Sequence, residues 1–376
     1  MKKLSLSVVA TSMTLAFAAS AYAQEVVVKI GHVAPISGAQ SHYGKDNENG
    51  ARLAINDLNA RKITIGGKLV KFELVPEDDA ADPKQGTQAA QKLVDAKVNG
   101  VVGHLNSGTT IPASRIYHDA GIPQITPAAT NPKYAQQGFK SAFRIIANDN
   151  ALGAATAIYA AKTLKAKKVA VIDDRTAYGQ GIADIFEKTA KAQGMQVAGR
   201  QFTNDKATDF QAILTAIKAA KPDVVFYGGM DPQAGPMLRQ MKQLGINAKM
   251  MGGDGICTEE LVKLGGAENV GSNVICAVGG SDLAKMPGGP DFQKRFREAY
   301  KMDIQLFAPY VYDAVMALAT AMQKANSTDP KKYLAELAKL DMKGVTGRVQ
   351  FESNGELKNA AVTLFTYKDG KKVALN

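Results

Sequence analysis

The feature that most constrains the fold is a regular alternation of short apolar runs with longer amphipathic stretches. The run from Val26 to Gly31 has the apolar character of a strand buried on both faces of a parallel sheet. A helical pattern follows from Tyr43 to Ala60. Further elements predicted in this section are strands at 69–75, 98–105 and 122–126 and helices at 83–96 and 111–119. The alternation predicts βαβ units in a doubly wound α/β sheet.

The same alternation begins again after a helix predicted at 151–164. The second set comprises strands at 168–173, 197–202, 223–227, 250–251 and 274–278 and helices at 179–193, 210–220 and 236–244. The C-terminal part adds helices at 292–300, 308–324 and 331–340 and strands at 347–351 and 361–367. Two sets of similar size predict two similar lobes. A chain of 376 residues also exceeds what one ordinary core holds.

The first 23 residues carry the three parts of a secretory signal peptide. Lys2 and Lys3 precede an apolar run from Leu4 to Ala19, and Ala21-Tyr22-Ala23 supplies a cleavage site. The run is shorter than the roughly 20 apolar residues that a membrane span needs. We expect cleavage after Ala23. Because neither cysteine lies near that site, we expect no lipid anchor and a soluble mature protein in the periplasm.

The charge of the chain is basic but diffuse, with a formal net charge of +11. Its densest lysine cluster, within 162–168, lies at the end of one predicted helix. A stripe of interleaved basic and aromatic residues, which indicates nucleic-acid binding, is absent, so the lysines are interpreted as solvated helix faces. The histidines show no ligand spacing for a metal; they are His32, His42, His104 and His118. We expect a monomer without cofactor, metal or nucleic-acid partner.

Cys257 and Cys276 are the two cysteines of the chain. An oxidising compartment permits a disulfide between them, which would close a short loop. Two buried free thiols are the alternative.

Polar residues directly after predicted strands are the candidate binding residues, because open α/β sheets bind ligands beyond the carboxyl ends of their strands. Residues 106–110 and 126–132 each combine hydroxyl side chains with a predicted helix start. Such residues serve as helix caps or, with free backbone N–H groups, bind an anion. One such loop is usually a helix cap. Two such loops on consecutive strands favour a pocket for a small anion and ordinary helix caps equally.

The second set of elements offers acidic residues at the corresponding places. Asp173 and Asp174 end a strand, and Asp254 lies between glycines directly after another. A turn aspartate is the alternative interpretation of Asp254. Hydroxyls and helix N-termini in one lobe opposite a carboxylate in the other suit a zwitterion such as an α-amino acid.

A set of short segments, in this order, resembles one family over nearly the whole mature chain. The segments are Gly38 to Gly44 ahead of Asn49-Gly50-Ala51-Arg52, Asp78 to Pro83, Gly103 to Ser107, Thr126 to Pro132, Tyr178-Gly179, Tyr227-Gly228-Gly229 and Met251 to Gly255. The family is the periplasmic leucine/isoleucine/valine (branched-chain amino acid) binding proteins of ABC importers. The resemblance implies the type I periplasmic binding protein fold, with two doubly wound parallel-sheet lobes joined by three crossovers.

The crossovers are expected near Ala147, near Ala277 and before the final strands. Lobe 1 would then comprise 24–147 and 278–360, and lobe 2 would comprise 148–277 and 361–376. The resemblance further implies capture of an aliphatic amino acid between lobes that close on it, and delivery to the permease subunits of the importer.

The resemblance also implies the ligand-binding residues. Ser107, Thr130 and the backbone of Ala128 would hold the ligand carboxylate, and Asp254 its ammonium. The full expected set is Tyr43, Asn106, Ser107, Ala128, Thr130, Tyr178, Met230 and Asp254, in which the two tyrosines wall the side-chain pocket.

The sequence departs from the family pattern in three places. These departures affect the expected preference for the side chain of the ligand more than the expectation that the ligand is an amino acid. Asp254 stands where some members have Glu, and Met230 stands where a tyrosine is often found. Ala81 and Asn106 occupy the positions of a disulfide that some relatives carry.

Three other functions are alternatives to amino-acid import. The chain has no G-x-S-x-G or G-x-x-x-x-G-K-[ST] motif and no base predicted beside Ser107, so we do not expect an enzyme. A binding protein of the same fold for short amides, urea or aromatic acids remains open, as does a ligand sensor for a membrane receptor. Asp254 discriminates among ligands, because it would repel an acid that lacks an ammonium group.

Overall fold

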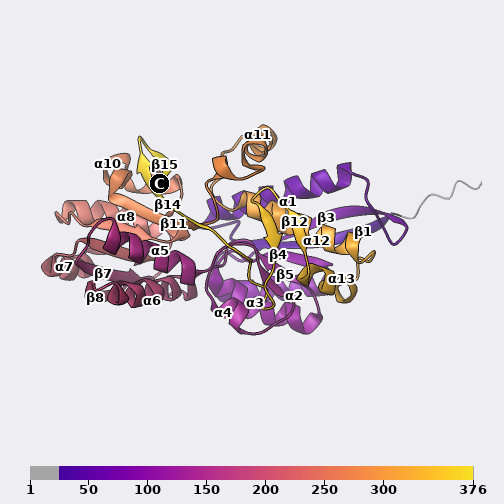
Figure 1. Ribbon diagram of the computed structural model, residues 1–376, viewed down its shortest axis with the longest axis horizontal. Coiled ribbons are helices and arrows are strands. Elements are labelled where there is room, and N and C mark those ends of the chain that lie inside the picture. The colour runs from indigo at the N-terminus through magenta and orange to yellow at the C-terminus, as the bar shows by residue number, and fades with distance from the viewer. Residues whose placement is uncertain (1–24, 376) are drawn as a thin grey trace, which may run out of the picture.

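The computed structural model describes residues 25–375. The signal peptide expected at 1–23 lies outside these residues. Two β-sheets lie at opposite ends of the long axis of the molecule, and thin connecting segments run between them (Figure 1). The predicted two-lobe α/β fold is therefore confirmed.

The first sheet has the strand order β2-β3-β1-β4-β5-β6. Its strands are β1 (Val26–Ala34), β2 (Thr64–Ile65), β3 (Lys68–Asp78), β4 (Gly100–Gly103), β5 (Gln124–Thr126) and β6 (Ala142–Arg144). Strands β3, β1, β4, β5 and β6 are parallel neighbours, and β2 pairs antiparallel to β3. The carboxyl ends of the central strands therefore meet at one edge, where their loops face the second sheet.

The second sheet has the order β15-β14-β11-β10-β9-β7-β8. Its strands are β7 (Lys168–Asp173), β8 (Gln196–Phe202), β9 (Val224–Gly228), β10 (Lys249–Gly252), β11 (Val274–Gly279), β14 (Val362–Lys368) and β15 (Lys371–Ala374). Strand β14 pairs antiparallel to β11, and β15 pairs antiparallel to β14. This antiparallel edge was not predicted, because the apolar pattern of a strand does not show whether the strand runs parallel or antiparallel to its neighbour. A separate antiparallel pair is formed by β12 (Asp341–Lys343) and β13 (Arg348–Gln350).

Helices cover both faces of each sheet. Those of the first lobe are α1 (Ser41–Ala60), α2 (Pro83–Asp95), α3 (Ser107–Ala120), α4 (Lys133–Gln136), α11 (Gly289–Tyr300), α12 (Ala308–Lys324) and α13 (Pro330–Ala338). Those of the second are α5 (Asp149–Lys162), α6 (Ala177–Ala192), α7 (Gln211–Ala220), α8 (Asp231–Gln243), α9 (Glu260–Gly265) and α10 (Ala267–Val270), with 3₁₀ turns η1 (Asp254–Ile256) and η2 (Gly271–Asn273). The 3₁₀ turn η3 (Leu283–Lys285) follows β11 and packs against α11 of the first lobe. Helix α12 packs on α1, so the chain returns to the first sheet after β11.

Alternate residues of β1 pack into two separate parts of the core. Val28 and Ile30 belong to the core on the side of α1 and α12, whereas Val33 packs with Leu93 of α2 and Tyr117 of α3. This alternation is the period-2 pattern of a strand covered on both faces. Among residues 25–375, none of the helices is both long and apolar enough to cross a membrane.

Two helix starts were predicted wrongly. Helix α3 begins at Ser107 rather than Ile111, and α8 begins at Asp231 rather than Pro236. Both predictions took an internal proline for the first helical turn. Pro112 and Pro236 lie inside their helices, where each removes a backbone donor. The correction matters for function, because it makes Ser107 the first residue of α3.

Candidate functional site

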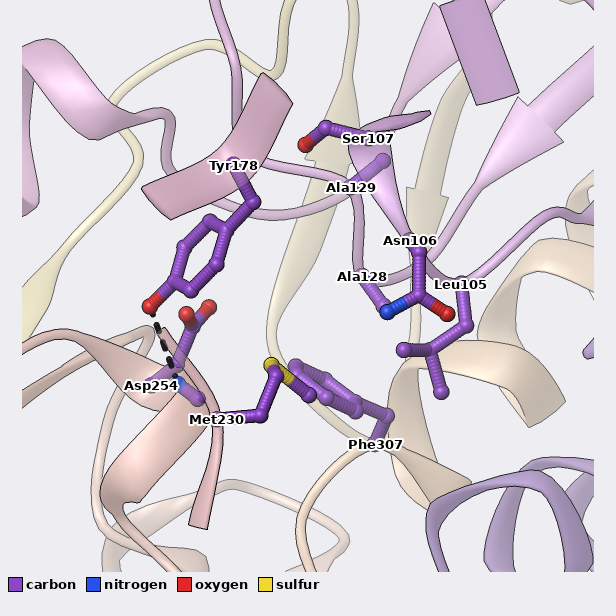
Figure 2. A pocket seen from close by; sticks show the side chains of 10 residues that line it. Leu105, Asn106, Ser107, Ala128, Ala129, Tyr178, Met230, Asp254 and Phe307 are labelled. Atoms are coloured by element: carbon purple, nitrogen blue, oxygen red, sulfur yellow. Dashed lines mark hydrogen bonds between the residues drawn. The ribbon is translucent and has the colours of Figure 1, made fainter. Parts of the chain in front are cut away.

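A cavity lies between the two lobes, where the loops after their strands meet (Figure 2). Its lining is Leu105, Asn106, Ser107, Ala128, Ala129 and Phe307 from the first lobe and Tyr178, Met230, Asp254 and Gly255 from the second. The cavity is tight: the centre of a water-sized sphere can move through only about 20 Å³ of it. Such a space suits a small solute and not a drug-sized ligand.

The first-lobe side of the cavity carries the N-terminus of α3. Ser107 is the first residue of that helix, and the first N–H groups of a helix have no partner within it. Together with the helix dipole they favour an anion. Ser107 Oγ accepts a hydrogen bond from the Asn131 N–H at 3.2 Å. Its own O–H therefore points elsewhere and is available as a donor.

The loop after β5 lies beside this helix N-terminus. Thr126 Oγ1 donates to the His104 carbonyl oxygen at 2.9 Å and accepts from the Ala129 N–H at 3.0 Å, which fixes the loop on β4. The Thr130 hydroxyl is buried near the Asp149 carboxyl, without hydrogen-bond geometry to any group in residues 25–375. The loop thus adds a buried hydroxyl that has no hydrogen-bond partner among the described residues.

The second-lobe side of the cavity is acidic. Asp254 follows β10 and begins the η1 turn, and it lies beside Tyr178 (Figure 2). Tyr178 Oη accepts a hydrogen bond from the Gly255 N–H at 3.0 Å. Burial raises the pKa of Asp254 to about 7, although hydrogen bonds from Tyr178 and the Gly255 backbone oppose the rise. Within the described residues Asp254 Oδ2 has no hydrogen-bond partner, which leaves it available to a ligand.

A second carboxylate lies close to Asp254. Asp149 is the first residue of α5, and neither of its carboxylate oxygens has a hydrogen-bond partner among residues 25–375. Burial, followed by the negative charge of Asp254, raises the pKa of Asp149 to about 8. A cationic group between these two carboxylates would relieve both the desolvation and the repulsion. Sequence reasoning missed Asp149, because an aspartate in the first turn of a helix has the usual signature of a dipole-stabilising residue.

Apolar side chains close the remaining walls. Leu105, Met230 and Phe307 all line the cavity (Figure 2). Phe307 was also missed, because it lies in a loop without periodicity before α12. Asp46 of α1 holds that loop, since its carboxylate accepts the N–H groups of Gln305, Leu306, Phe307 and Ala308 at 2.9–3.2 Å.

The lobes contact one another around the cavity. Tyr43 Oη of α1 donates to the Gly255 carbonyl oxygen at 2.9 Å. Asn131 Nδ2 donates to the Ala177 carbonyl oxygen at 2.5 Å. His42 Nε2 lies 2.9 Å from Asp231 Oδ2. These contacts describe a closed arrangement of the lobes.

The structure brings together most of the residues predicted for the site. Asn106, Ser107 and Ala128 meet Tyr178, Met230 and Asp254 around one cavity. Tyr43 and Thr130 lie just outside the lining: the Tyr43 ring centroid is 6.2 Å from that of Phe307, and Thr130 lies near Asp149. Asn106 Nδ2 donates to Gln40 Oε1 at 2.8 Å.

The predicted disulfide is present. Cys257 and Cys276 are joined, with their Cα atoms 5.5 Å apart, within the usual range for a disulfide. Cys257 directly follows the η1 turn and Cys276 lies in β11. The bridge therefore ties the turn that carries Asp254 to the central part of the second sheet.

The histidine nearest to Ser107 is engaged elsewhere. His104 is fully buried, with Nδ1 3.0 Å from Asp79 Oδ2 and Nε2 3.0 Å from the Tyr117 hydroxyl oxygen. It is thus held in a hydrogen-bonded network and is not positioned as a base for Ser107. Residues 25–375 contain no group of three or more His, Cys, Asp or Glu side chains placed to hold a metal ion.

The fold and the site define a class: a two-lobe protein that encloses a small solute between its lobes. The family model described as periplasmic binding protein matches residues 27–372, and the chain belongs to that family. A Leu/Ile/Val-binding protein homolog 1 from Brucella suis is 35% identical over 372 residues, which cover 98% of this chain and 97% of that protein.

Solved structures agree in fold. The leucine-binding protein LivK of Thermotoga maritima has a TM-score of 0.85 and 29% identity, and the match covers 93% of this chain and 98% of that one. The substrate-binding protein LivJ of a branched-chain amino acid transporter from Streptococcus pneumoniae, solved with isoleucine, has a TM-score of 0.84 and 29% identity, with 93% and 99% covered. This chain is accordingly a solute-binding protein and not an enzyme.

Proposed function

We propose that the protein captures a branched-chain or similar aliphatic amino acid between its lobes and delivers it to the permease subunits of an ABC importer. The observation that carries the proposal is the pairing across one cavity of Ser107, at a helix N-terminus, with the available carboxylate of Asp254. An anion-binding side opposite an acidic side matches the two charges of an α-amino acid.

The two charged groups of the ligand would have different partners. Its carboxylate would accept hydrogen bonds from Ser107, from Thr130 and from the backbone at Ala128, in the positive field of the α3 N-terminus. Its ammonium would lie against Asp254, with Asp149 close enough to add a second carboxylate. This arrangement supplies partners to groups that otherwise stay buried without them.

The side chain of the ligand would face apolar groups. Leu105, Met230 and Phe307 offer no charge to a ligand side chain, and the backing tyrosine Tyr43 is held by Gly255. Relatives named for leucine, isoleucine and valine binding support the same ligand class. Met230 is flexible and adapts to different shapes, so several aliphatic amino acids should fit.

The lobes would move as the units 24–147 with 278–360 and 148–277 with 361–376. The division of strands between two sheets supports this assignment, since the chain passes from β6 to α5, from β11 to α11 and from β13 to β14. Closure would complete the site, because neither lobe alone supplies both charges.

Export with cleavage after Ala23 would deliver a soluble monomer to the periplasm. The residue pattern of 1–23 and the periplasmic character of the family support this location.

A thermal-shift screen tests the proposal. The panel should contain amino acids, their des-amino analogues, short amides, urea and aromatic acids. Leucine, isoleucine and valine should each raise the unfolding midpoint, because a ligand that binds only the folded state stabilises it. A best ligand without an amino group would replace the amino-acid assignment with the amide or aromatic-acid alternative.

The proposed role of Ser107 predicts that removal of its hydroxyl weakens leucine binding. Ser107→Ala should weaken leucine binding by an order of magnitude or more, because a hydrogen bond to a charged group contributes roughly 1.5–3 kcal/mol. Isothermal titration calorimetry measures the change, with Ser114→Ala as a control whose hydroxyl lies further along the same helix. Unchanged affinity in Ser107→Ala would remove that hydroxyl from the site.

Leucine binding should weaken as the pH falls from 7 to 5. The pKa of Asp254 is raised to about 7 by burial, and only its ionised form attracts an ammonium group. Below that pKa, protonation competes with the ligand and should lower the affinity by up to about tenfold per pH unit. Asp174→Asn is the control, because burial raises the pKa of Asp174 to about 6 outside the cavity lining. A leucine affinity that does not change with pH in the wild type would contradict this role of Asp254. So would a pH dependence that disappears in Asp174→Asn.

A substitution at Gly181 of α6 should weaken ligand binding without lowering the stability of the protein, because Gly181 lies at a contact between the closed lobes. A Cβ atom there would lie 2.5 Å from Asn131 Nδ2 in the opposite lobe. Gly181→Ala should therefore disturb the Asn131 bond to Ala177 and weaken binding about threefold to tenfold. Its unfolding midpoint should hold or rise, since Ala favours a helix by roughly 0.5–1 kcal/mol over Gly. In an Asn131→Ala background the same change should not weaken binding further; an equal loss in both backgrounds would place the effect elsewhere.

A further inference from the structure

We propose that Arg144 is a positioning residue for ligand-carboxylate binding: it holds the loop at 129–131 in its binding geometry and couples that loop to the chain segment between β13 and β14. The inference rests on the proposed function, because it assumes that this loop contacts the ligand carboxylate.

Arg144 is the last residue of β6, and its side chain is fully buried. Its Nε and Nη2 donate to Glu356 Oε2 and Oε1, each at 2.9 Å. This is the two-pronged pairing for which a guanidinium is suited and an ammonium is not. A buried arginine is tolerated only with such partners.

The same guanidinium also binds the loop at 129–131 (the ligand loop). Arg144 Nη1 donates to the Ala129 carbonyl oxygen, and Nη2 donates to the Asn131 carbonyl oxygen at 3.0 Å. In a trans peptide the N–H points opposite to the C=O, so anchoring the Ala129 carbonyl aims the Thr130 N–H away from Arg144. Anchoring Asn131 also places the amide that reaches Ala177 across the cleft.

Glu356 connects this contact to the third passage between the lobes. It lies in the segment between β13 and β14, and the Arg144 N–H donates to the neighbouring Gly355 carbonyl oxygen at 2.8 Å. One side chain thus joins three parts of the molecule: the end of β6, the ligand loop and a segment that runs to the second sheet. A shift of that segment is transmitted to the loop through the guanidinium.

The test separates the fork geometry of Arg144 from its charge. Arg144→Lys keeps the positive charge but cannot make the four contacts together. We expect leucine affinity to fall at least tenfold, whereas leucinamide, which keeps the ammonium and side chain but lacks the carboxylate, should lose less than threefold. Glu356→Gln retains the arginine and should reduce the leucine to leucinamide affinity ratio by at least threefold.

Arg200→Lys is the matched control, because Arg200 also pairs with several carboxylates, including Asp173, but lies in the second lobe away from the cavity lining. It should lower the unfolding midpoint without changing the ratio. A ratio unchanged in Arg144→Lys, with a midpoint loss like that of the control, would make Arg144 merely structural. If Arg144→Lys does not fold, an unchanged ratio in Glu356→Gln overturns the inference. Failure of the wild type to bind leucine would instead overturn the proposed function.

Discussion

Asp254→Asn is expected to weaken leucine binding by a few hundredfold to several thousandfold. The substitution keeps the shape of the side chain but removes the charge that faces the ligand ammonium. Breaking a buried, hydrogen-bonded ion pair from one side leaves the other charge unpaired, with a loss of roughly 3–5 kcal/mol. Asp149 should recover part of this loss, because its carboxylate lies near the same place. Isothermal titration calorimetry at pH 7.5, where Asp254 is largely ionised, measures the effect.

The control for this prediction is Asp174→Asn, which changes a buried carboxyl of the same lobe outside the cavity lining. Its leucine affinity should stay within a few-fold of the wild type. Discrimination is a second readout: Asp254→Asn should narrow the preference for leucine over 4-methylpentanoate, because the repulsion of a ligand without an ammonium group is removed. An unaltered preference would show that Asp254 does not face the amino group.

Replacing both cysteines, Cys257→Ala with Cys276→Ala, is expected to lower the free energy of unfolding by about 3 kcal/mol in the chain-entropy model. The bridged residues are 19 positions apart. The bridge closes this short loop in the unfolded chain and so lowers the conformational entropy of the unfolded state. Urea unfolding followed by circular dichroism measures the change. Replacing both residues together avoids a lone thiol.

Thiol titration provides the control for the disulfide prediction. Denatured, unreduced wild-type protein should show no free thiol, and reduced protein should unfold at a urea concentration close to that of the double variant. Leucine affinity should also decrease modestly in the double variant, since the bridge anchors the turn that carries Asp254. Two free thiols in the unreduced protein, together with equal stabilities, would contradict the assignment of this bridge.

The fold was predictable because its main signal is local. A strand such as β1, buried on both faces, must be apolar along its length, and each amphipathic helix shows its own period. The starts of α3 and α8 were predicted wrongly because Pro112 and Pro236 imitate helix starts. The antiparallel pairing of β14 and β15 depends on long-range contacts, which no local pattern encodes.

The candidate site was predictable where its residues follow strands. Ser107 and Asp254 follow the carboxyl ends of parallel strands, one in each sheet, so the topology places each at the ligand-binding edge of its own lobe. Phe307 and Asp149 were not predictable in this way. Phe307 reaches the cavity because Asp46, far away in sequence, binds its loop. Asp149 lies in an ordinary first helical turn, and only the folded structure shows that its carboxylate is buried without a hydrogen-bond partner among residues 25–375 and within the electrostatic influence of Asp254.

Calorimetric titration of three ligands with the same side chain into protein stripped of bound ligand tests whether the cavity holds an α-amino acid by both of its charges. The ligands are leucine, 4-methylpentanoate, which lacks the ammonium, and 3-methylbutylamine, which lacks the carboxylate. We predict saturable one-to-one binding of leucine, and binding at least a hundredfold weaker for each analogue, because each leaves one side of the cavity unpaired. Binding of 4-methylpentanoate as tight as that of leucine, or no binding of leucine at all, would contradict this prediction.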